Sequence, residues 1–361
     1  MNKNRNKGSA LKVNDGVQQP PILNEHAAKI FSRKKNTITD PEIFLNGILN
    51  GNRTILSRAI TMIESALPAH QEMAQAIITQ CLPYAGNSVR IGITGVPGVG
   101  KSTFIETFGK YLTSQGKKIA VLAIDPSSSR SKGSILGDKT RMEELASDPN
   151  AFIRPSPSAG SLGGVARKTR ETIILCEAAG YDTILVETVG VGQSEITVHS
   201  MVDFFLLLML AGAGDELQGI KRGIMEMADA VVIHKADGDN INKVNIALAE
   251  LRNALHFFPP TISGWQPTCE AASSYTGMGI EKIQTIIDNY TSFTKANGYF
   301  ALRRLEQSKQ IMSSFIEDAL HEKFYANDNV KKRMPQLESQ IAEGKISAYQ
   351  AAQMLLDSYL Q

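Results

Sequence analysis

Five short apolar runs set the pattern of the middle of the chain. They are VRIGITG, KIAVLAID, DTILVET, FFLLLML and AVVIHKAD, and they lie between positions 89 and 237. Each is about as long as a strand and is nearly continuously apolar, which is typical of strands buried on both faces of a parallel sheet. Helical stretches alternate with them. The pattern predicts an α/β fold with a mostly parallel sheet and helices on both faces.

The N-terminal part of the chain has a different pattern. Residues 1–40 are polar, contain QQPP, and predict a poorly ordered lead-in. Asp40 followed by Pro41 resembles a helix N-cap with proline at the first helical position. Apolar residues then recur at helical spacing, and Pro68 is expected to end one helix before another begins. We therefore expect a small helical subdomain over residues 41–87.

The C-terminal part is again helical in its pattern. The predicted sheet and its helices occupy residues 88–293, and residues 294–361 predict amphipathic helices that are rich in charge. Such helices cannot bury their apolar faces alone. We expect them to pack on the sheet domain or on another subunit.

Composition excludes several classes of function. Lys plus Arg number 38 and Asp plus Glu 36, so the net charge of +2 gives no strong electrostatic case for binding nucleic acid or a membrane surface. The most apolar run, FFLLLML, is far shorter than the roughly 20 residues that span a bilayer. Three widely spaced cysteines favour a reducing compartment. We expect the protein to be located in the cytoplasm of a bacterium; the mitochondrial matrix is the less favoured location.

The strongest chemical signal is GVPGVGKST, which fits the phosphate-binding pattern G-x-x-x-x-G-K-[S/T] in full and lies between a predicted strand and a predicted helix. Glycines let the backbone N–H groups turn inward around phosphate oxygens, and the helix N-terminus adds partial positive charge. The lysine would reach the β and γ phosphates, the serine would bind Mg²⁺, and the threonine would bond the α phosphate. The candidate residues are Gly95, Val96, Pro97, Gly98, Val99, Gly100, Lys101, Ser102 and Thr103.

Two carboxylates at predicted strand ends are candidates for the metal side of this site. Glu187 ends the run DTILVET, where an acid suits Mg²⁺ binding, either direct or through water. Asp125 ends the run KIAVLAID in the same geometry, although it could instead cap the following turn. Gly190, three residues after Glu187, could place its amide on a γ-phosphate and sense its loss.

A third motif points to the base of the nucleotide. The segment HKAD follows an apolar strand, and Lys-x-Asp there is the guanine reader of small GTPases. Asp237 can accept hydrogen bonds from guanine N1–H and the 2-amino group, donors that adenine lacks. The stem of Lys235 would cover the ring. His234 stands where most GTPases have Asn, and its imidazole can still donate a hydrogen bond to the loop or to the base.

A weaker signal follows in SSYTGMGI, which begins at position 273. It occupies the place of the loop that contacts the far edge of guanine in GTPases. Ser273, Ser274 and Tyr275 are the candidates, and the backbone amide of Ser274 would contact guanine O6.

With these motifs in order, the chain resembles the MeaB/ArgK GTPases, a family that includes the methylmalonic aciduria type A protein. The matching stretches are GVPGVGKST, DPSSSRSKGSILGDKTRM, VETVGVGQSE, LAGAGDELQGIKRGI and HKADGDN. The resemblance covers about residues 40–361. It implies a SIMIBI-class P-loop domain with helical extensions at both ends and dimerisation through the C-terminal part. It also implies a GTP-driven chaperone of adenosylcobalamin-dependent methylmalonyl-CoA mutase, with GTP/GDP and Mg²⁺ as cofactors.

Two further segments gain an interpretation from the resemblance. DPSSSRSKGSILGDKTRM resembles a first switch, with Asp138 and Arg141 as candidates for contacts that change with nucleotide state. AGAGDELQGIKRGI resembles the third switch of the family, with Asp215 and Lys221 as candidate signalling residues. Two glycines before its acidic pair fit a mobile loop.

The hypothesis that these motifs favour is a GTP hydrolase whose cycle controls a partner enzyme. Lys101 and Mg²⁺ would neutralise charge on the transferring phosphoryl group, and Asp125 and Glu187 would organise the metal. The motifs contain no obvious water-orienting Gln or arginine finger, so we expect slow intrinsic turnover. The alternatives are a small-molecule (arginine-type) kinase, a metal-insertion GTPase and an ATP-driven targeting module.

Overall fold

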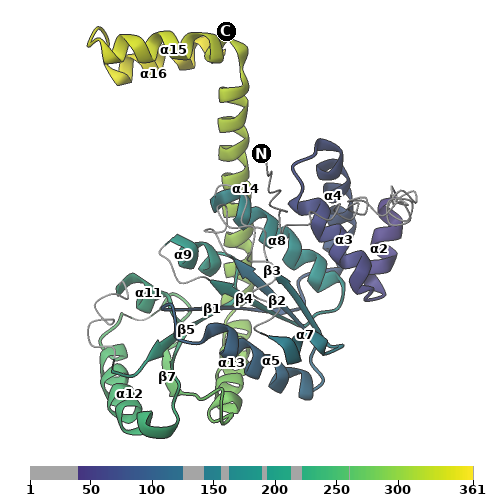
Figure 1. Ribbon diagram of the computed structural model, residues 1–361, viewed down its shortest axis with the longest axis vertical. Helices are drawn as coiled ribbons and strands as arrows, with labels where there is room; N and C mark the ends of the chain where they lie inside the picture. The colour runs from purple at the N-terminus through teal and green to yellow at the C-terminus, as the bar shows by residue number, and fades with distance from the viewer. Residues whose placement is uncertain are drawn as a thin grey trace, which may run out of the picture. The chain divides into compact units, whose positions relative to one another are not determined.

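A single sheet of parallel strands organises the part of the chain that the structure describes. The structure, a computed structural model, describes residues 40–124, 142–155, 162–188, 193–212, 222–259 and 261–360. Within these ranges seven strands pair in the order β3-β2-β4-β1-β5-β6-β7, and every pairing is parallel. The strands are β1 (Val89–Gly95), β2 (Ile119–Ile124), β3 (Ala151–Pro155), β4 (Thr183–Thr188), β5 (Phe204–Leu210), β6 (Ala230–His234) and β7 (Thr268–Ala271) (Figure 1).

The predicted fold class is confirmed. The five apolar runs of the sequence form the five inner strands β2, β4, β1, β5 and β6. The two strands that the pattern did not indicate, β3 and β7, lie at the edges of the sheet. They are short, with the sequences AFIRP and TCEA; β3 is buried at four of its five positions but includes Arg154 and Pro155, and β7 buries only Cys269. Their mixed composition therefore carried little of the apolar signal.

Helices cover both faces of the sheet because the side chains of each inner strand alternate between two apolar layers. In β5, Phe204, Leu206 and Leu208 join one core, and Leu207 and Met209 join the other. The first core includes α5 (Lys101–Ser114), α7 (Glu143–Ser147) and α13 (Ile280–Ala296). The second face carries α8 (Leu162–Ala178), α9 (Gln193–His199), α11 (Arg222–Met227) and α12 (Ile241–Leu255). Figure 1 shows α8 and α9 on one side of the strands and α5 and α13 on the other.

Three helices and a short 3-10 turn precede the sheet: α2 (Pro41–Leu49), α3 (Arg53–Glu64), α4 (Pro68–Cys81) and η1 (Leu82–Tyr84). The side chain of Asn52 caps α3 by accepting from the N–H groups of Thr54 and Ile55. The prediction for Pro68 was wrong in detail. The preceding helix already ends at Glu64, and Pro68 is instead the first residue of α4, where the missing N–H of proline costs no hydrogen bond.

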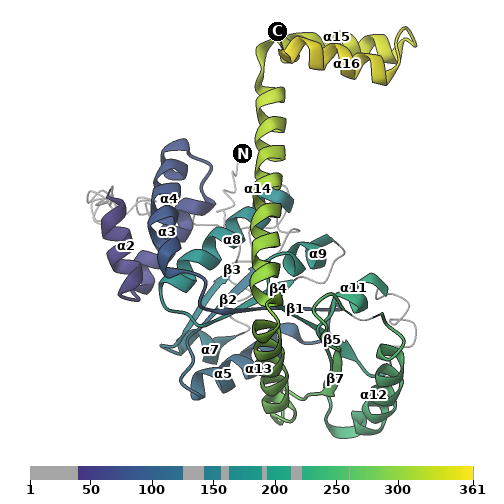
Figure 2. The ribbon, with the colours of Figure 1, turned by 180° about the vertical axis from the view of Figure 1, so that it is seen from behind.

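The C-terminal helices are α14 (Tyr299–Ala326), α15 (Asp328–Ala342) and α16 (Ala348–Leu360). Figure 2 shows α14 rising directly from the end of α13. The first turns of α14 contact the sheet domain through polar side chains. Arg304 pairs with Asp203 at 2.7 Å, Arg303 lies 3.7 Å from Asp229, and Gln307 donates to the carbonyl of Val202 at 2.8 Å.

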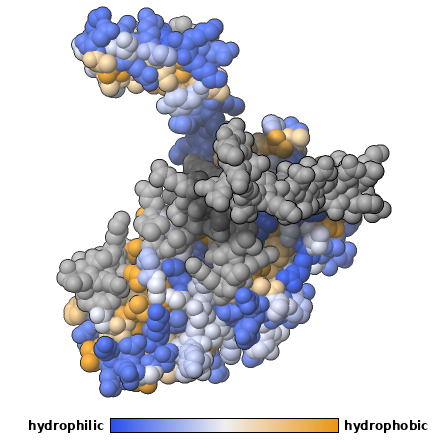
Figure 3. Space-filling view, in the orientation of Figure 1, coloured by the Kyte–Doolittle hydropathy of each residue, from blue (hydrophilic) through white to orange (hydrophobic). Residues whose placement is uncertain are grey.

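Several apolar side chains of α14 remain partly exposed. About half of the surface of each of five of them is exposed: Leu302, Leu305, Phe315, Ile316 and Leu320. The helices α15 and α16 bury Val330, Leu337 and Ala351. Apolar surface is visible along the lower edge of this pair in Figure 3. Among the described residues, no helix combines the length and the apolar character that crossing a bilayer requires.

The turn between β7 and α13 provides a test of the backbone geometry. Gly277 and Gly279 both have positive φ, but only Gly279 is also crowded, because an added Cβ would lie 2.0 Å from the carbonyl oxygen of Ala271. We expect Gly277→Ala to lower the free energy of unfolding by about 1–2 kcal/mol. Gly279→Ala should cost about 3–5 kcal/mol, since the backbone must also move. Urea denaturation of both variants measures the difference, and equal losses would contradict the geometry.

Candidate functional site

Most of the described candidate residues lie at one edge of the sheet, where parallel strands end at their carboxyl termini. β1 leads into the phosphate loop, β4 carries Glu187 near its end, and β6 ends at His234. Ser273 follows the end of β7 by two residues. This is the edge at which ligands bind in open parallel sheets. Segments far apart in the sequence are therefore brought together in one place.

The loop between β1 and α5 requires its glycines. Gly95 has φ 154°, and an added Cβ would lie 2.4 Å from the carbonyl oxygen of Leu208 on the neighbouring strand. Gly100 has φ 94° and forms the cap of α5, with no room for a side chain beside the ring of His234. Val99 is fully buried and anchors the loop to the core. The helix N-terminus therefore follows directly on a tightly turned backbone, as binding of a phosphate group requires.

Lys101 is buried against this loop, with only 8% of its surface exposed. Its ammonium donates to the carbonyl oxygens of Gly95, at 2.7 Å, and Val96, at 3.3 Å. Burial lowers the pKa of Lys101, while the nearby carboxylates of Glu187 and Glu195 act in the opposite direction. The site thus holds a desolvated cation among backbone carbonyls, where the oxygens of a phosphate chain could replace them.

Two of the three predicted metal ligands are in contact. The hydroxyl of Ser102 donates to Oε1 of Glu187 at 3.1 Å, and 9% of the surface of Glu187 is exposed. Glu187 lies opposite Ile93 in the pairing of β1 with β4, and the buried hydroxyls of Thr94 and Thr188 bond to each other at 2.9 Å just beyond it. A hydroxyl and a carboxylate are hard oxygen donors, so these two side chains fit Mg²⁺.

His234 connects the phosphate loop to the predicted base loop. Its Nδ1 lies 2.7 Å from the carbonyl oxygen of Val99, and its Nε2 lies 2.7 Å from the hydroxyl of Ser274. Burial lowers the pKa of His234, which favours the neutral ring. A carbonyl only accepts, so Nδ1 carries the proton and Nε2 accepts from the serine. Both ring nitrogens therefore bond protein groups, and of the two partners considered from the sequence, the loop or the base, the structure shows a loop, the phosphate loop.

Lys235 and Asp237 lie beside this connection. Lys235 has φ 59°, the left-handed region, and its exposed side chain donates to the carbonyl oxygen of Gly98 at 3.0 Å. The carboxylate of Asp237 accepts a hydrogen bond from the hydroxyl of Ser273. The chain turn at Lys235 thus directs its stem over the phosphate loop, and the carboxylate of Asp237 is held in a fixed position by the base loop.

The base loop is organised around Ser273. Its hydroxyl, besides donating to Asp237, accepts from the backbone N–H groups of Tyr275 and Thr276, both at 3.2 Å. The side chain of Tyr275 is 92% exposed. The carbonyl of Ser274 accepts from Thr107 of α5 at 3.2 Å. The loop is therefore tied both to the Lys-x-Asp segment and to the helix that follows the phosphate loop.

Several candidates lie outside the described residues: Asp125, Asp138, Arg141, Gly190, Asp215 and Lys221. Two residues that the sequence reading did not assign take part in the site. Glu195 is buried and acts on the charge of Lys101, and its position in the first turn of α9, within VGQSE, was the available signal. Thr107 ties α5 to the base loop, and no sequence motif indicated it.

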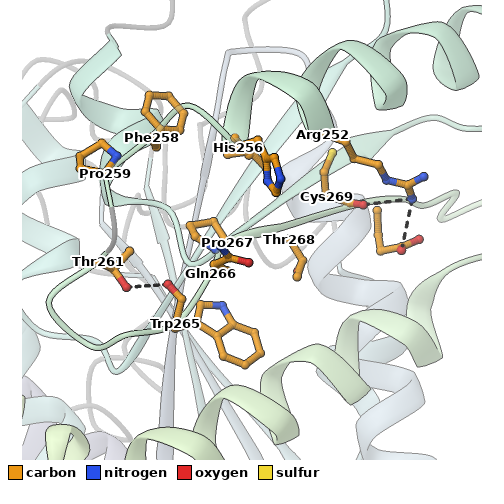
Figure 4. Close-up of a pocket in the computed structure, with 12 residues that line it drawn as sticks. Arg252, His256, Phe258, Pro259, Thr261, Trp265, Gln266, Pro267, Thr268 and Cys269 are labelled. Carbon is orange, nitrogen blue, oxygen red and sulfur yellow. Dashed lines mark hydrogen bonds and ion pairs between the residues drawn. The ribbon is translucent and has the colours of Figure 1, made fainter.

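A cavity in another part of the protein is lined by none of the candidate residues. It has a volume of about 330 Å³ and lies at the edge strand β7, beside the end of α12. Figure 4 shows Trp265 and Pro267 among the residues that line it. Trp265 is fixed there by a hydrogen bond from its indole N–H to the carbonyl of Asp229 at 3.0 Å. This cavity lies apart from the motifs, so the motifs and their contacts define the candidate site.

The His234 connection predicts a graded effect on nucleotide binding. His234→Ala removes both hydrogen bonds and should weaken nucleotide affinity by roughly 10- to 100-fold, because the two loops lose their common tie. His234→Asn can restore one bond and should lose less than about tenfold. Titration with a fluorescent guanosine nucleotide measures both. His256→Ala, an exposed histidine after α12, is the control. Equal affinity of wild type and His234→Ala would refute the connection.

Comparison with known proteins identifies the family. The family model described as "Methylmalonyl Co-A mutase-associated GTPase MeaB" matches residues 56–329. The protein is 48% identical over 280 residues to "GTPase ArgK" of Escherichia coli, covering 77% of this chain and 84% of that protein. It is 44% identical over 347 residues to "Methylmalonic aciduria type A homolog, mitochondrial" of Mus musculus, covering 93% and 83%.

A solved structure agrees with the sequence comparison. The "Crystal structure of LAO/AO transport system kinase" superposes with a TM-score of 0.71 at 36% identity, covering 89% of this chain and 98% of that one. The family match spans the phosphate loop, the Lys-x-Asp segment and the base loop described above. The protein is therefore a GTPase, and it belongs to the family of methylmalonyl-CoA mutase-associated GTPases, MeaB.

Proposed function

We propose that this GTPase is a chaperone of adenosylcobalamin-dependent methylmalonyl-CoA mutase, which it protects or reactivates and whose cofactor loading it gates. The observation that carries the proposal is that a histidine of the Lys-x-Asp segment is joined by hydrogen bonds to the phosphate loop, in a chain whose family is named for the mutase. The mouse relative is named for methylmalonic aciduria, the disorder of the same metabolite. Nucleotide state would set how the protein acts on the mutase.

Guanine selection would rest on Asp237. Its carboxylate accepts from Ser273 in this structure and retains further lone pairs for N1–H and the 2-amino group of guanine. Adenine has neither donor at these positions, so it would leave the carboxylate without partners. The stem of Lys235, held by the carbonyl of Gly98, would lie over the ring. The amide of Ser274 would contact guanine O6.

Magnesium would be held by the hydroxyl of Ser102 and the carboxylate of Glu187, with Asp125 as the further candidate. When bound, the ion would neutralise charge on the phosphate oxygens. Lys101 would contribute a second positive charge from inside the loop, and burial makes its interaction with phosphate stronger than in water. The amide of Gly190 would meet the γ-phosphate. The residues named in the motifs supply no group to orient water, so the mutase would supply or position it.

Signalling to the mutase would depend on the two predicted switches. Asp138 and Arg141 in the first, and Asp215 and Lys221 in the third, are the residues we propose to change contacts with nucleotide state. In the sequence, the third switch lies between β5 and α11, and part of it falls outside the described residues. Ile241 and Ile246 of α12 are exposed, and Ile246 lines a hollow together with Gly212 at the end of β5; such apolar side chains would favour a protein partner there.

The protein would act as a homodimer through its C-terminal helices. The half-exposed apolar side chains of α14, among them Phe315 and Leu320, form a row on one helix, and such a row is stable in water when another apolar surface covers it. A second copy presents the same row and satisfies the symmetry of a two-fold contact.

We place the protein in the bacterial cytoplasm, since its three cysteines are buried and unpaired, as in a reducing compartment.

A small-molecule kinase is the alternative function. The solved relative is titled a transport system kinase, which makes phosphate transfer to a small acceptor testable. Incubation with radiolabelled GTP in the presence of arginine, and separately without arginine, distinguishes the kinase from the hydrolase. Labelled phosphoarginine would favour the kinase, and release of inorganic phosphate alone favours the hydrolase.

Asp237→Asn should change the base preference of the protein from guanine to xanthine. The new amide can donate to the 2-oxo group of xanthine, where the carboxylate is repelled, and can no longer accept both guanine donors. GTP affinity should fall by at least about 100-fold and XTP affinity should rise. Calorimetric titration with both nucleotides measures the exchange. Asp239→Asn, two residues on and exposed, is the matched control. Unchanged GTP affinity in Asp237→Asn would refute the base reader.

Lys221→Ala tests the coupling to the mutase. If the third switch carries the signal, basal hydrolysis and GTP affinity should remain within about twofold of wild type, because coupling is a difference in contacts between two states. The acceleration of hydrolysis by purified mutase should fall several-fold. Lys118→Ala, exposed before β2 at the opposite end of the strands, is the control. Equal stimulation of wild type and Lys221→Ala would overturn the assignment of the third switch.

A further inference from the structure

The backbone amides of the base loop leave one hydrogen-bond donor without a protein acceptor. The other amides between positions 273 and 278 all donate within the loop: Ser273 to the carbonyl of Met278, Tyr275 and Thr276 to the hydroxyl of Ser273, Gly277 to the carbonyl of Ser273, and Met278 to the hydroxyl of Thr276. The amide of Ser274 has no acceptor among the residues that the structure describes. Backbone N–H groups are almost always paired, so this donor is available to a ligand.

The direction of this amide follows from its own peptide group. The carbonyl of Ser273 and the N–H of Ser274 belong to one planar trans peptide, so they point in opposite directions. The carbonyl points back into the loop, where it accepts from the amide of Gly277 at 2.9 Å. The N–H of Ser274 therefore points out of the loop.

The same residue is held by side chains from two other elements. The hydroxyl of Ser274 donates to Nε2 of His234 at the end of β6, 2.7 Å away, and its carbonyl accepts from the hydroxyl of Thr107 on α5 at 3.2 Å. Phe104 lies one turn before Thr107 on the same face of α5, and its ring packs edge to face with the ring of His234. The position of the unpaired amide is therefore set from α5 and from β6.

A donor amide close to an acceptor carboxylate matches one edge of guanine. Asp237, which bonds the neighbouring Ser273, supplies the acceptor, and the amide of Ser274 supplies the donor. Guanine presents two donors, N1–H and the 2-amino group, next to one acceptor, O6. Adenine carries an amino group at position 6, so its donor would face the donor of Ser274 and both would lack a partner.

We propose that the hydroxyls of Ser274 and Thr107 are positioning groups for recognition of the 6-oxo group of the purine. Both act through the amide of Ser274, which they hold where O6 of guanine would lie, and not on the base itself. The inference rests on the proposed guanine selection by Asp237. It adds a second discrimination, at position 6 of the purine, that can be separated from the reading of the 2-amino group.

Three nucleoside diphosphates separate the two discriminations. GDP has both groups, 6-thio-GDP has sulfur, a weaker acceptor, in place of O6, and IDP lacks the 2-amino group. Affinities are measured by calorimetric titration in the presence of Mg²⁺. Wild type should prefer GDP to 6-thio-GDP by about tenfold. Ser274→Ala and Thr107→Val should each reduce this preference by about threefold or more, while the preference for GDP over IDP changes by less than about twofold.

Further variants show whether the hydroxyls act through these contacts. Thr107→Ser keeps the hydroxyl and should restore the wild-type preference. In a His234→Ala background, Ser274→Ala should have a smaller effect than in wild type, because the acceptor of its hydroxyl is already absent. Thr285→Val on α13 and Ser114→Ala at the end of α5, both exposed, are the matched controls and should keep both preferences.

The possible results distinguish this inference from the proposed guanine selection. It is overturned if wild type prefers GDP to 6-thio-GDP and both variants, Ser274→Ala and Thr107→Val, keep the full preference. It is also overturned if the preference for GDP over IDP falls equally in these variants, since the whole loop would then have lost its structure. A wild type that distinguishes IDP but not 6-thio-GDP from GDP overturns this inference alone, and one that distinguishes neither overturns the guanine selection as well.

Discussion

The geometry of the nucleotide site depends on the two hydrogen bonds that the imidazole of His234 makes. The ring lies between the carbonyl of Val99 in the phosphate loop and the hydroxyl of Ser274 in the base loop, 2.7 Å from each. These loops follow β1 and β7, which are separated by two other strands of the sheet. In the proposed site a nucleotide would contact both loops at once, so their separation would have to be held to within about 1 Å. The neutral ring fixes that separation because one nitrogen donates and the other accepts.

Gly100 shows how closely the two loops are fitted. An added Cβ at this position would lie 2.9 Å from the ring of His234, and the rings of Phe104 and His234 pack edge to face with their centroids 5.8 Å apart. The aromatic ring therefore occupies a space that exists only because position 100 has no side chain. A larger residue at position 100 would displace His234 and with it the base loop. The phosphate motif and the base motif are thus mutually dependent in three dimensions.

Sequence reasoning identified the inner strands and the nucleotide motifs because both have strong local signals. FFLLLML is apolar at every position, as a strand between two helical layers must be, and GVPGVGKST meets a spacing that few other structures require. The edge strands gave no such signal, because β3 ends in Arg154 and Pro155 after only three apolar residues, and TCEA in β7 has only one well-buried residue. Sequence reasoning allowed His234 a hydrogen bond to the loop or to the base, but the bond to Ser274 depends on residues 40 positions apart. Local patterns cannot show such a contact.

The root of α14 has a mechanical consequence. Arg303, Arg304 and Gln307 hold the first turns of this 28-residue helix to the segments around Asp203 and Asp229, through buried charge pairs that resist displacement. The part after Gln307 runs for about 28 Å at about 1.5 Å per residue. A tilt of about 5° at the root would move its far end by about 2–3 Å. A small tilt of the first turns of α14 against the sheet domain would thus move the far end of the helix by about the length of a side-chain contact.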